Sequence, residues 1–493
     1  MGQLKQLAGQ TVIYGASSVL GRVLNYLLVP LYTTVFTPEA YGVVTELYAF
    51  VAFLNILYTY GFETTYFRFA TKSEEPHKFF NIATGSLLFS SLLFSGLMII
   101  LSDQVADLLQ YSGQGKYVRW LAVVLAIDAV VAVPFARLRL EGRAVKFAAM
   151  KLGNIALNIL LNLFFLVFCP LWLGLHPDSW INLIYYEELG VGYVFLSNLI
   201  ANSLYLLPFA NWLFKIKLHF GAEWRAMLKY AWPLLLMGFA GVTNEMLSRV
   251  LLKYWLPVGF YSGFTNLEVL GIFGASYKLS VFMTLAVQAF KYAFEPFFFS
   301  KSKDDNSPEL FAKVMHGFII FGAFFWLAIS LFLPDIAPIF LRRESYLTAL
   351  DIVPWLLGGG LFLGIYFNLS VWYKLTDKTI YGAWITIIGA LVTVVVNILL
   401  IPRIGYLGSA VTSLLSYLTM VLISYFIGQK HYHIPYHTVK GLFYIVLAGV
   451  SIIGAYFWQP DFISKYFISI GLLLVFVFFV WVLDIRTGTF VKK

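Results

Sequence analysis

The sequence contains a single cysteine, Cys169, among its 493 residues. No disulfide can therefore form within the chain, and none of the spaced-cysteine motifs that hold metals is present. The sequence also lacks the G-x-x-x-x-G-K-[ST] string that cradles nucleotide phosphates. The nearest string, SGQGKY at residues 112–117, has neither the first glycine nor the final hydroxyl. These absences argue against a disulfide scaffold, a cysteine-based metal centre and an ATP-driven pump.

Charged residues are scarce as well. They make up 12% of the chain, whereas hydrophobic residues make up 60%. A soluble protein has about 25% charged residues, so this composition indicates a polytopic membrane protein. The formal net charge is +9. In a membrane protein, Lys and Arg are enriched in the loops on the cytoplasmic side. The positive charge therefore does not predict a nucleic-acid partner.

Apolar segments long enough to cross a bilayer, which takes about 20 residues, occur about fourteen times. We place these spans at 9–36, 41–67, 79–101, 117–136, 147–169, 191–214, 231–256, 271–299, 314–341, 351–373, 379–401, 405–428, 441–458 and 466–483. All breaks between them are short, which leaves no room for a soluble catalytic domain. We therefore expect an all-α polytopic membrane protein that is not an enzyme.

The distribution of Lys and Arg predicts the orientation of the chain. An even number of spans puts both termini on one side of the membrane. Both termini and every second break, such as 137–146 and 215–229, are several-fold richer in Lys and Arg than the other breaks. Because basic residues concentrate on the cytoplasmic side, we expect both termini to be cytoplasmic. The first apolar run is too long for a cleavable signal peptide and should remain as the first helix.

Short segments with weakly similar sequences recur six spans apart. The break RLEGR (139–143) parallels KLTDK (374–378), and each precedes a span that contains Asn-Ile-Leu-Leu. YGVVTELY (41–48) and LGIFGASY (270–277) likewise begin the second and eighth spans. Repeats in the same orientation are related by an axis along the membrane normal. This spacing predicts two six-helix lobes around a central cavity, followed by two extra helices.

The lobe boundaries follow from this repeat. We expect an N-terminal lobe at 1–219, a C-terminal lobe at 220–437, and the extra helices thirteen and fourteen at 438–493.

The polar residues Asn158, Asn244 and Asn397 lie within spans. Such residues usually hydrogen-bond across helices, and we expect them to join the helices of each lobe.

Two stretches carry a family resemblance. GQTVIYGASSVLGRVLNYLLVPLYTTVFTPEAYGVVTELYAF (9–50) and IPRIGYLGSAVTSLLSYL (401–418) resemble bacterial polysaccharide flippases of the multidrug/oligosaccharidyl-lipid/polysaccharide exporter superfamily. The resemblance implies fourteen helices arranged 6+6+2. It also implies export of an undecaprenyl-diphosphate-linked oligosaccharide across the bacterial inner membrane, without a cofactor. Membrane lipids and polysaccharide polymerase or assembly proteins would be its partners.

Cations inside the spans are the candidate substrate ligands. Arg22 lies deep in the first span with Asn25 one turn further on, Arg249 lies in the seventh span, and Lys278 in the eighth. Intramembrane charges usually face a partner or a cavity, and Arg suits the bidentate binding of phosphates. Arg22 extends toward the membrane interface, forms a buried pair with Glu46 or lines the central cavity. Arg249 either pairs with Glu245, four residues earlier, or is the counterpart of Arg22 in the second lobe.

Acidic residues in the spans are the candidates for ion coupling. Glu46 and Glu63 lie in the second span, Asp128 in the fourth and Glu245 in the seventh. An acid in a medium of low dielectric constant can exchange protons during a transport cycle. Each of them could instead neutralise a nearby Arg. The counter-ion, H⁺ or Na⁺, is left open, as is a drive by the membrane potential alone.

Several alternatives remain at this point. A multidrug or cation antiporter and a lipid II flippase belong to the same superfamily, and a membrane-bound polysaccharide polymerase or acyltransferase belongs to a different class. The intramembrane cations favour an anionic substrate over cationic drugs. The histidine-rich string HYHIPYH (431–437) lies in a predicted cytoplasmic break. We interpret it as a solvated loop and predict no metal site.

Overall fold

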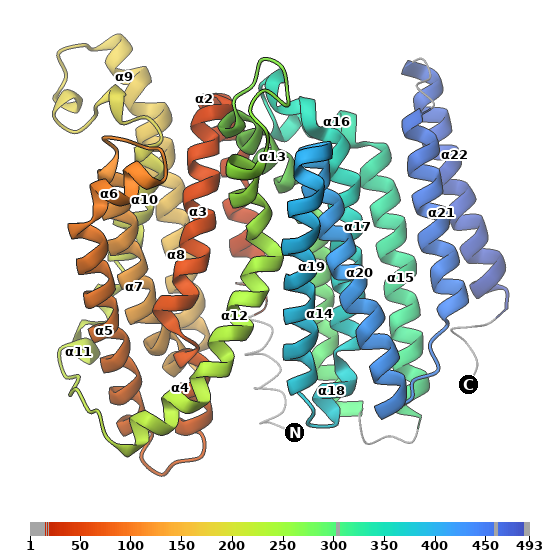
Figure 1. Ribbon diagram of the computed structural model, residues 1–493, viewed down its shortest axis with the longest axis horizontal. Coiled ribbons are helices and arrows are strands. Elements are labelled where there is room, and N and C mark those ends of the chain that lie inside the picture. Colours follow the sequence, from red (N-terminus) through yellow and green to blue (C-terminus); the bar gives the residue numbers. More distant parts are fainter. Residues whose placement is uncertain (1–14, 16, 18, 302–305, 458–461, 488–493) are drawn as a thin grey trace. The chain divides into compact units, whose positions relative to one another are not determined.

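The computed structural model describes residues 15–487, except 16, 18, 302–305 and 458–461. Every regular element of this described part is a helix (Figure 1). The described residues contain 11 helices long and apolar enough to cross a membrane, or up to 13 if each bent pair counts as one span. The predicted all-helical membrane fold is therefore confirmed.

The first predicted span, 9–36, lies partly outside the described residues. Its described part includes a shorter apolar helix, Val19–Val35. The following spans overlap their predicted segments, with ends that differ by up to ten residues: Pro38–Ala70 covers the predicted 41–67, whereas Ser307–Leu331 corresponds to 314–341. Length and hydropathy alone therefore locate most of the spans in this chain.

The contacts within the chain divide it into two compact units. Unit 1 contains Met1–Phe36 and Val43–Val242, and unit 2 contains Thr37–Gly42 and Thr243–Lys493. The division falls inside the long helix α12 (Ala222–Trp255), beyond the lobe boundary that we predicted at 219/220. The lobes of the transport mechanism remain a prediction.

Unit 1 is built around α7 (Gly115–Leu140), in which 72% of the apolar stretch is buried. Its 26 residues span about 39 Å at 1.5 Å per residue, enough to cross the hydrocarbon core. The other helices of this unit are α2 (Leu28–Val35), most of α3 (Pro38–Thr59), α4 (Phe62–Ala70), α5 (Pro76–Ile100), α6 (Ser102–Leu108), α8 (Ala144–Leu163), η1 (Phe164–Phe168), α9 (Cys169–Leu175), η2 (Trp180–Leu183), η3 (Glu187–Leu189), α10 (Gly192–Ser203), α11 (Leu206–Leu213) and the first part of α12.

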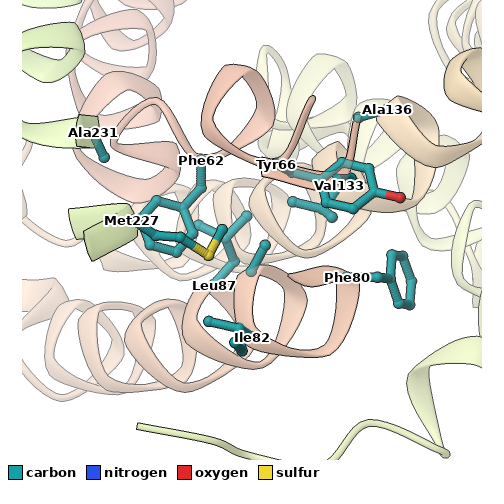
Figure 2. Packing of buried hydrophobic residues seen from close by; sticks show 11 residues of the cluster. Phe62, Tyr66, Phe80, Ile82, Leu87, Val133, Ala136, Met227 and Ala231 are labelled. Atoms are coloured by element: carbon teal, nitrogen blue, oxygen red, sulfur yellow. The ribbon is translucent and has the colours of Figure 1, made fainter. Parts of the chain in front are cut away.

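A buried apolar cluster joins four helices of unit 1 (Figure 2). Phe62 from α4, Phe80 from α5, Val133 from α7 and Met227 from α12 all belong to it. Gly61 separates α3 from α4 with a φ of 74°, and a Cβ atom there would lie 2.8 Å from Leu234 Cβ. A side chain at this position would therefore be strained and would push α12 away.

Unit 2 contains α13 (Asn266–Leu279), α14 (Val281–Lys301), α15 (Ser307–Leu331), α16 (Leu333–Phe340), η4 (Glu344–Ile352), α17 (Val353–Leu369), α18 (Val371–Leu375), α19 (Ile380–Ile404), α20 (Tyr406–His431), α21 (Thr438–Phe457), α22 (Phe462–Val480) and η5 (Trp481–Ile485), together with the end of α12. Thr265 and Glu268 form a capping box that begins α13. The predicted span 271–299 is broken, because α13 and α14 meet at an angle of 41°.

Two glycines let the first turn of α3 approach α13 within unit 2. A Cβ atom on Gly271 would lie 1.9 Å from Pro38 O and 2.9 Å from Gly42 N. A Cβ atom on Gly42 would lie 2.2 Å from Leu267 O. Small residues allow helix backbones to touch in membrane proteins, and here no larger residue fits. Gly42 and Gly271 hold equivalent places in the predicted repeat.

Candidate functional site

A polar cavity of about 510 Å³ lies within unit 1. Two of the predicted acidic residues, Glu63 and Asp128, line it. It is also lined by two cations, Arg139 and Lys151. The other lining residues are Asn55, Ile56, Thr59, Gly61, Thr64, Val131, Ala132, Phe135, Phe147, Leu234 and Gly238. The helices α3, α4, α7, α8 and α12 thus bring charges of both signs to one place.

Asp128 belongs to a chain of side-chain hydrogen bonds. Asn202 Nδ2 on α10 donates to Asp128 Oδ1 at 2.9 Å, and Asn154 Nδ2 on α8 donates to Asn202 Oδ1 at 2.9 Å. Lys151 interacts electrostatically with Asp128. Its Nζ lies 4.2 Å from the ring centroid of Phe135 and 5.1 Å from that of Tyr205. Aromatic faces attract a cation, so the two rings fix the position of the ammonium in the cavity wall.

Glu63 forms an ion pair with Arg139 from the last turn of α7. The guanidinium of Arg139 also lies 5.0 Å from the ring centroid of Phe67. Arg139 belongs to the RLEGR string that the sequence analysis placed in a cytoplasmic break. The structure shows that the side chain of Arg139 lines the cavity. An acid that already has a cation partner is better suited to holding a structure than to releasing a proton.

The sequence did not single out Lys151 and Arg139 as lining residues of this cavity, nor Asn202 and Asn154 as the hydrogen-bond chain to Asp128. A usable signal existed for Lys151, because it lies five positions inside the predicted span 147–169. A lysine at that depth points to a cavity or a partner. No pattern in the chain links Asn202 to Asp128, since the two are 74 residues apart and meet only when α10 packs on α7.

A second polar cluster, in unit 2, brings together three of the predicted residues: Glu245, Arg249 and Lys278. Electrostatic interactions link Lys278 to Arg249 and to Glu245. The guanidinium of Arg249 stacks over the ring of Tyr277 at 4.3 Å, and its Nη1 lies 2.7 Å from Met246 Sδ. Lys278 lies one residue before the end of α13, next to the bend into α14.

The side chain of Arg249 has one hydrogen-bond donor without a partner among the described residues. This donor is the buried Nε. Within that same part of the chain, Glu245 and Arg249 do not come within ion-pair distance, so the structure does not support the i, i+4 pair considered from the sequence. A buried, unsatisfied guanidinium N–H favours an acceptor such as a phosphate oxygen.

Arg22, Asn25 and Glu46 do not line the polar cavity of unit 1. The side chains of Arg22 and Asn25 are exposed on the described part of the first helix. Glu46 is fully buried and accepts a hydrogen bond from the hydroxyl of Tyr111. Among the described residues no ion pair joins Arg22 to Glu46. The contact of Arg22 and Asn25 with substrate stays a prediction, as does ion coupling by Glu46.

The histidine-rich string is held by ring packing. His431 stacks on Trp372 with ring centroids 5.4 Å apart, and its Nδ1 lies 3.0 Å from Ile427 O. Over the described ranges, no group of three or more His, Cys, Asp and Glu residues could hold a metal ion.

A sequence comparison with protein families matches residues 7–300 to the family described as polysaccharide biosynthesis protein. The match covers more than half of the chain. The protein belongs to this family. A comparison with curated protein sequences gives no match.

Solved structures with the same fold are transporters. The lipid II flippase MurJ, in an inward closed conformation, is 14% identical with a TM-score of 0.71 over 96% of this chain and 100% of that chain. An inward-facing multidrug resistance MATE family transporter of the MOP superfamily is 14% identical, with a TM-score of 0.61 over 83% of this chain and 94% of its own. A MOP superfamily transporter from Pyrococcus furiosus is 15% identical, with a TM-score of 0.53 over 86% and 95%.

The chain thus belongs to a polysaccharide biosynthesis family and has the fold of a lipid II flippase and of transporters of the MOP superfamily. The resemblance expected from the residues at 9–50 and 401–418 is thereby confirmed in family and in fold. The fold is shared with solved transporters.

Proposed function

We propose that this protein moves an undecaprenyl-diphosphate-linked oligosaccharide from the cytoplasmic to the outer leaflet of the bacterial inner membrane by alternating access. Such a substrate has a hydrated glycan and a diphosphate, and their unassisted passage would require the desolvation of many polar groups. The polysaccharide biosynthesis family points to a glycan as the cargo. Both termini would lie in the cytoplasm, and polymerase or assembly proteins would receive the product.

The observation that carries the proposal is the open guanidinium donor of Arg249 beside Lys278. With one acid, Glu245, and two cations, the cluster keeps a net positive charge, which attracts an anion. A diphosphate can accept hydrogen bonds from both, and such charge-assisted bonds are short and strong. Arg22 and Asn25, which are exposed on the first helix, are further candidate ligands of the cargo.

The cavity of unit 1 would serve ion coupling. Asp128, held by Asn202 and beside Lys151, is the acid with the most suitable surroundings. Binding of H⁺ or Na⁺ at Asp128 would remove the attraction that holds Lys151 and free this cation for the substrate. Glu63, Glu46 and Glu245 are the remaining candidates for this role.

The membrane potential would favour export. Each elementary charge that crosses the membrane gains about 2.3 kcal/mol per 100 mV. With the inside negative, an anionic substrate moves outward downhill, and emptied cationic sites return inward downhill. The membrane potential would therefore favour both the outward movement of the loaded substrate and the inward return of the empty cationic sites.

The test compares Arg249→Ala, Lys278→Ala, Lys151→Met and Arg22→Ala with Lys146→Met as a matched control. Lys146 is exposed near the start of α8. Surface polysaccharide, lipid-linked precursor and protein level would be measured in cells. We expect polysaccharide to fall about tenfold or more in the first two variants, because each loses a hydrogen bond to a charged group. Lipid-linked precursor should accumulate inside the cell, and Lys146→Met should behave like the wild type.

Wild-type polysaccharide in Arg249→Ala, Lys278→Ala and Arg22→Ala together would disprove a cationic diphosphate site. In vesicles that contain the purified protein, an unchanged flipping rate after the potential is dissipated would disprove the electrogenic drive. The likeness to MurJ over nearly the whole chain favours lipid II as a second candidate cargo. Growth of cells that are depleted of their own lipid II flippase, when this protein is expressed, would support that cargo instead.

A further inference from the structure

Two adjoining cavities lie at one end of unit 2, where α21 and α22 meet the other helices. The first, of about 390 Å³, is lined by residues of α15, α16, η4, α17, α21 and α22. The second, of about 370 Å³, is lined by residues of α15, η4, α17, α20 and α21. They share Asp351, Pro354, Ile452 and Tyr456. The predicted topology puts this end of the unit at the outer leaflet.

The two cavities differ in chemistry. The second is apolar apart from Asp351, and its walls include Trp326 and the exposed side chains of Trp355 and Phe457. Trp326 Nε1 donates to Pro354 O at 2.8 Å, which fixes this ring in the wall. We call this the apolar cavity. Because several of its wall residues are exposed on the helix surface, the cavity opens toward the surrounding lipid.

The first cavity has charged groups at its edge, and we call it the charged cavity. Asp351 Oδ1 is buried, and no described residue hydrogen-bonds to it. Lys465 also lines this cavity and pairs with Asp335, with Nζ–Oδ2 at 3.0 Å. Tyr466 donates to the same carboxylate at 2.9 Å. Ser330 Oγ, another wall atom, is buried and has no hydrogen-bond partner among the described residues.

These groups give the site a net negative charge and leave one acceptor unsatisfied. A buried carboxylate oxygen without a donor is costly, so the site favours a ligand with an N–H cation. Lys465 has three donors and can contribute one to a nearby phosphate. An anionic headgroup without an amine would be repelled by Asp351 and Asp335 together. An apolar chamber next to an ammonium site fits one class of molecule, a phospholipid with an amine headgroup.

We propose that the two cavities hold one amine-headgroup phospholipid of the surrounding membrane. Its ammonium donates to Asp351, its phosphate lies toward Lys465, and an acyl chain occupies the apolar cavity beside Trp326. This lipid is a resident of the C-terminal helices and not the exported cargo. It fills the space between α21 and the helices α15 and α17, which protein atoms leave open.

The experiment uses purified full-length protein, stripped of lipid in detergent and titrated with phosphatidylethanolamine or phosphatidylglycerol of identical acyl chains. Bound lipid is counted by native mass spectrometry. The variant Asp351→Asn removes the charge, and Asp377→Asn is its matched control, because Asp377 is exposed and its φ of 57° suits Asn. Gly449→Leu blocks the apolar cavity, since a Cβ atom there makes only ordinary contact with Trp326, at 3.5 Å. Thermal unfolding confirms that each variant is folded.

We expect wild-type protein and Asp377→Asn to bind phosphatidylethanolamine about tenfold more tightly than phosphatidylglycerol. Asp351→Asn should lose this preference, and Gly449→Leu should bind both lipids more weakly. Equal binding of the two lipids by the wild type, or an unchanged preference in Asp351→Asn, would overturn the proposal. Displacement of phosphatidylethanolamine by a lower concentration of a polyprenyl phosphate would also overturn it, since the cavities would then belong to the cargo. The measurement does not depend on transport and stands whether or not the proposed cargo is right.

Discussion

Asp484 shows how a single charge is accommodated within the membrane-spanning helices. It is fully buried at the end of the last span, on the π-helical turn η5. Three side chains surround its carboxylate: His316 of α15 at 2.9 Å, Lys440 of α21 at 3.1 Å, and the hydroxyl of Tyr444. A buried charge is tolerated when it is both paired and hydrogen-bonded. These partners fasten the C-terminal helices to α15.

Removal of this carboxylate should therefore destabilise the protein. In Asp484→Ala, His316, Lys440 and Tyr444 lose their shared acceptor, and the donors at the buried end of this cluster are left unsatisfied. We expect the free energy of unfolding to fall by on the order of 3 kcal/mol, seen as a lower midpoint of thermal unfolding in detergent. The matched control is Asp178→Ala, on an exposed turn, which should change it by less than about 0.5 kcal/mol. Equal midpoints for the two variants would refute the role of the cluster.

The repeated strings behave as structural elements where the chain turns. RLEGR contains the turn between α7 and α8, with Gly142 at a φ of 71°. KLTDK contains the turn between α18 and α19, with Asp377 at a φ of 57°. Both turns could be predicted, because breaks between apolar runs carry glycine and charge. The bend at Ser280 between α13 and α14 could not, since the apolar pattern continues through it.

The asparagines in the spans follow the expected pattern only in part. Asn397 Nδ2 donates to Ser248 Oγ at 3.1 Å, and Thr393 donates to Asn244 Oδ1 at 3.0 Å. These bonds join α12 to α19, as predicted. Asn158, however, accepts from Asn162 on its own helix. The sequence identifies polar residues within spans, but which neighbour they face depends on the rotation of each helix.

The contact between α3 and α13 gives a test of element packing. In Gly271→Ala, the added Cβ would collide with the backbone at Pro38, which cannot move aside as a flexible side chain does. We expect a loss of about 1–3 kcal/mol in the free energy of unfolding. Gly241→Ala is the matched control, since that helical glycine has open space around its Cβ position and Ala favours a helix. The thermal midpoint should drop in the first variant only; a drop of equal size in both would count against the close contact.

At the scale of the whole molecule, the distribution of Lys and Arg predicts which side of the membrane each loop faces. The chain suits a direct measurement, because its one cysteine, Cys169, is fully buried. In a Cys169→Ser background, Asp178→Cys and Lys217→Cys would each place one thiol at an exposed position. The predicted topology puts residue 178 outside and residue 217 in the cytoplasm.

Labelling with a membrane-impermeant maleimide separates the two orientations. On spheroplasts we expect the thiol at 178 to react, and the thiol at 217 to react only after the membrane is permeabilised. The reverse pattern would place the termini outside and would invert the direction of transport proposed here. Labelling of both thiols before permeabilisation would mean that the spheroplasts leak, which a cytoplasmic marker protein checks.

The sequence alone determined the membrane class, the position of most spans and the family, because these depend on the local density of apolar residues and on short motifs. It also singled out Arg249, Lys278, Asp128 and Glu63 as charges in unusual places. Only the tertiary structure decided which charges meet. Lys151 interacts electrostatically with Asp128, and Asp484 hydrogen-bonds with His316. Nothing in the spacing of these residues along the sequence predicts either pair. A helix buries whichever face its neighbours cover, so the partner of an intramembrane charge depends on the packing of the helices and not on their sequence spacing.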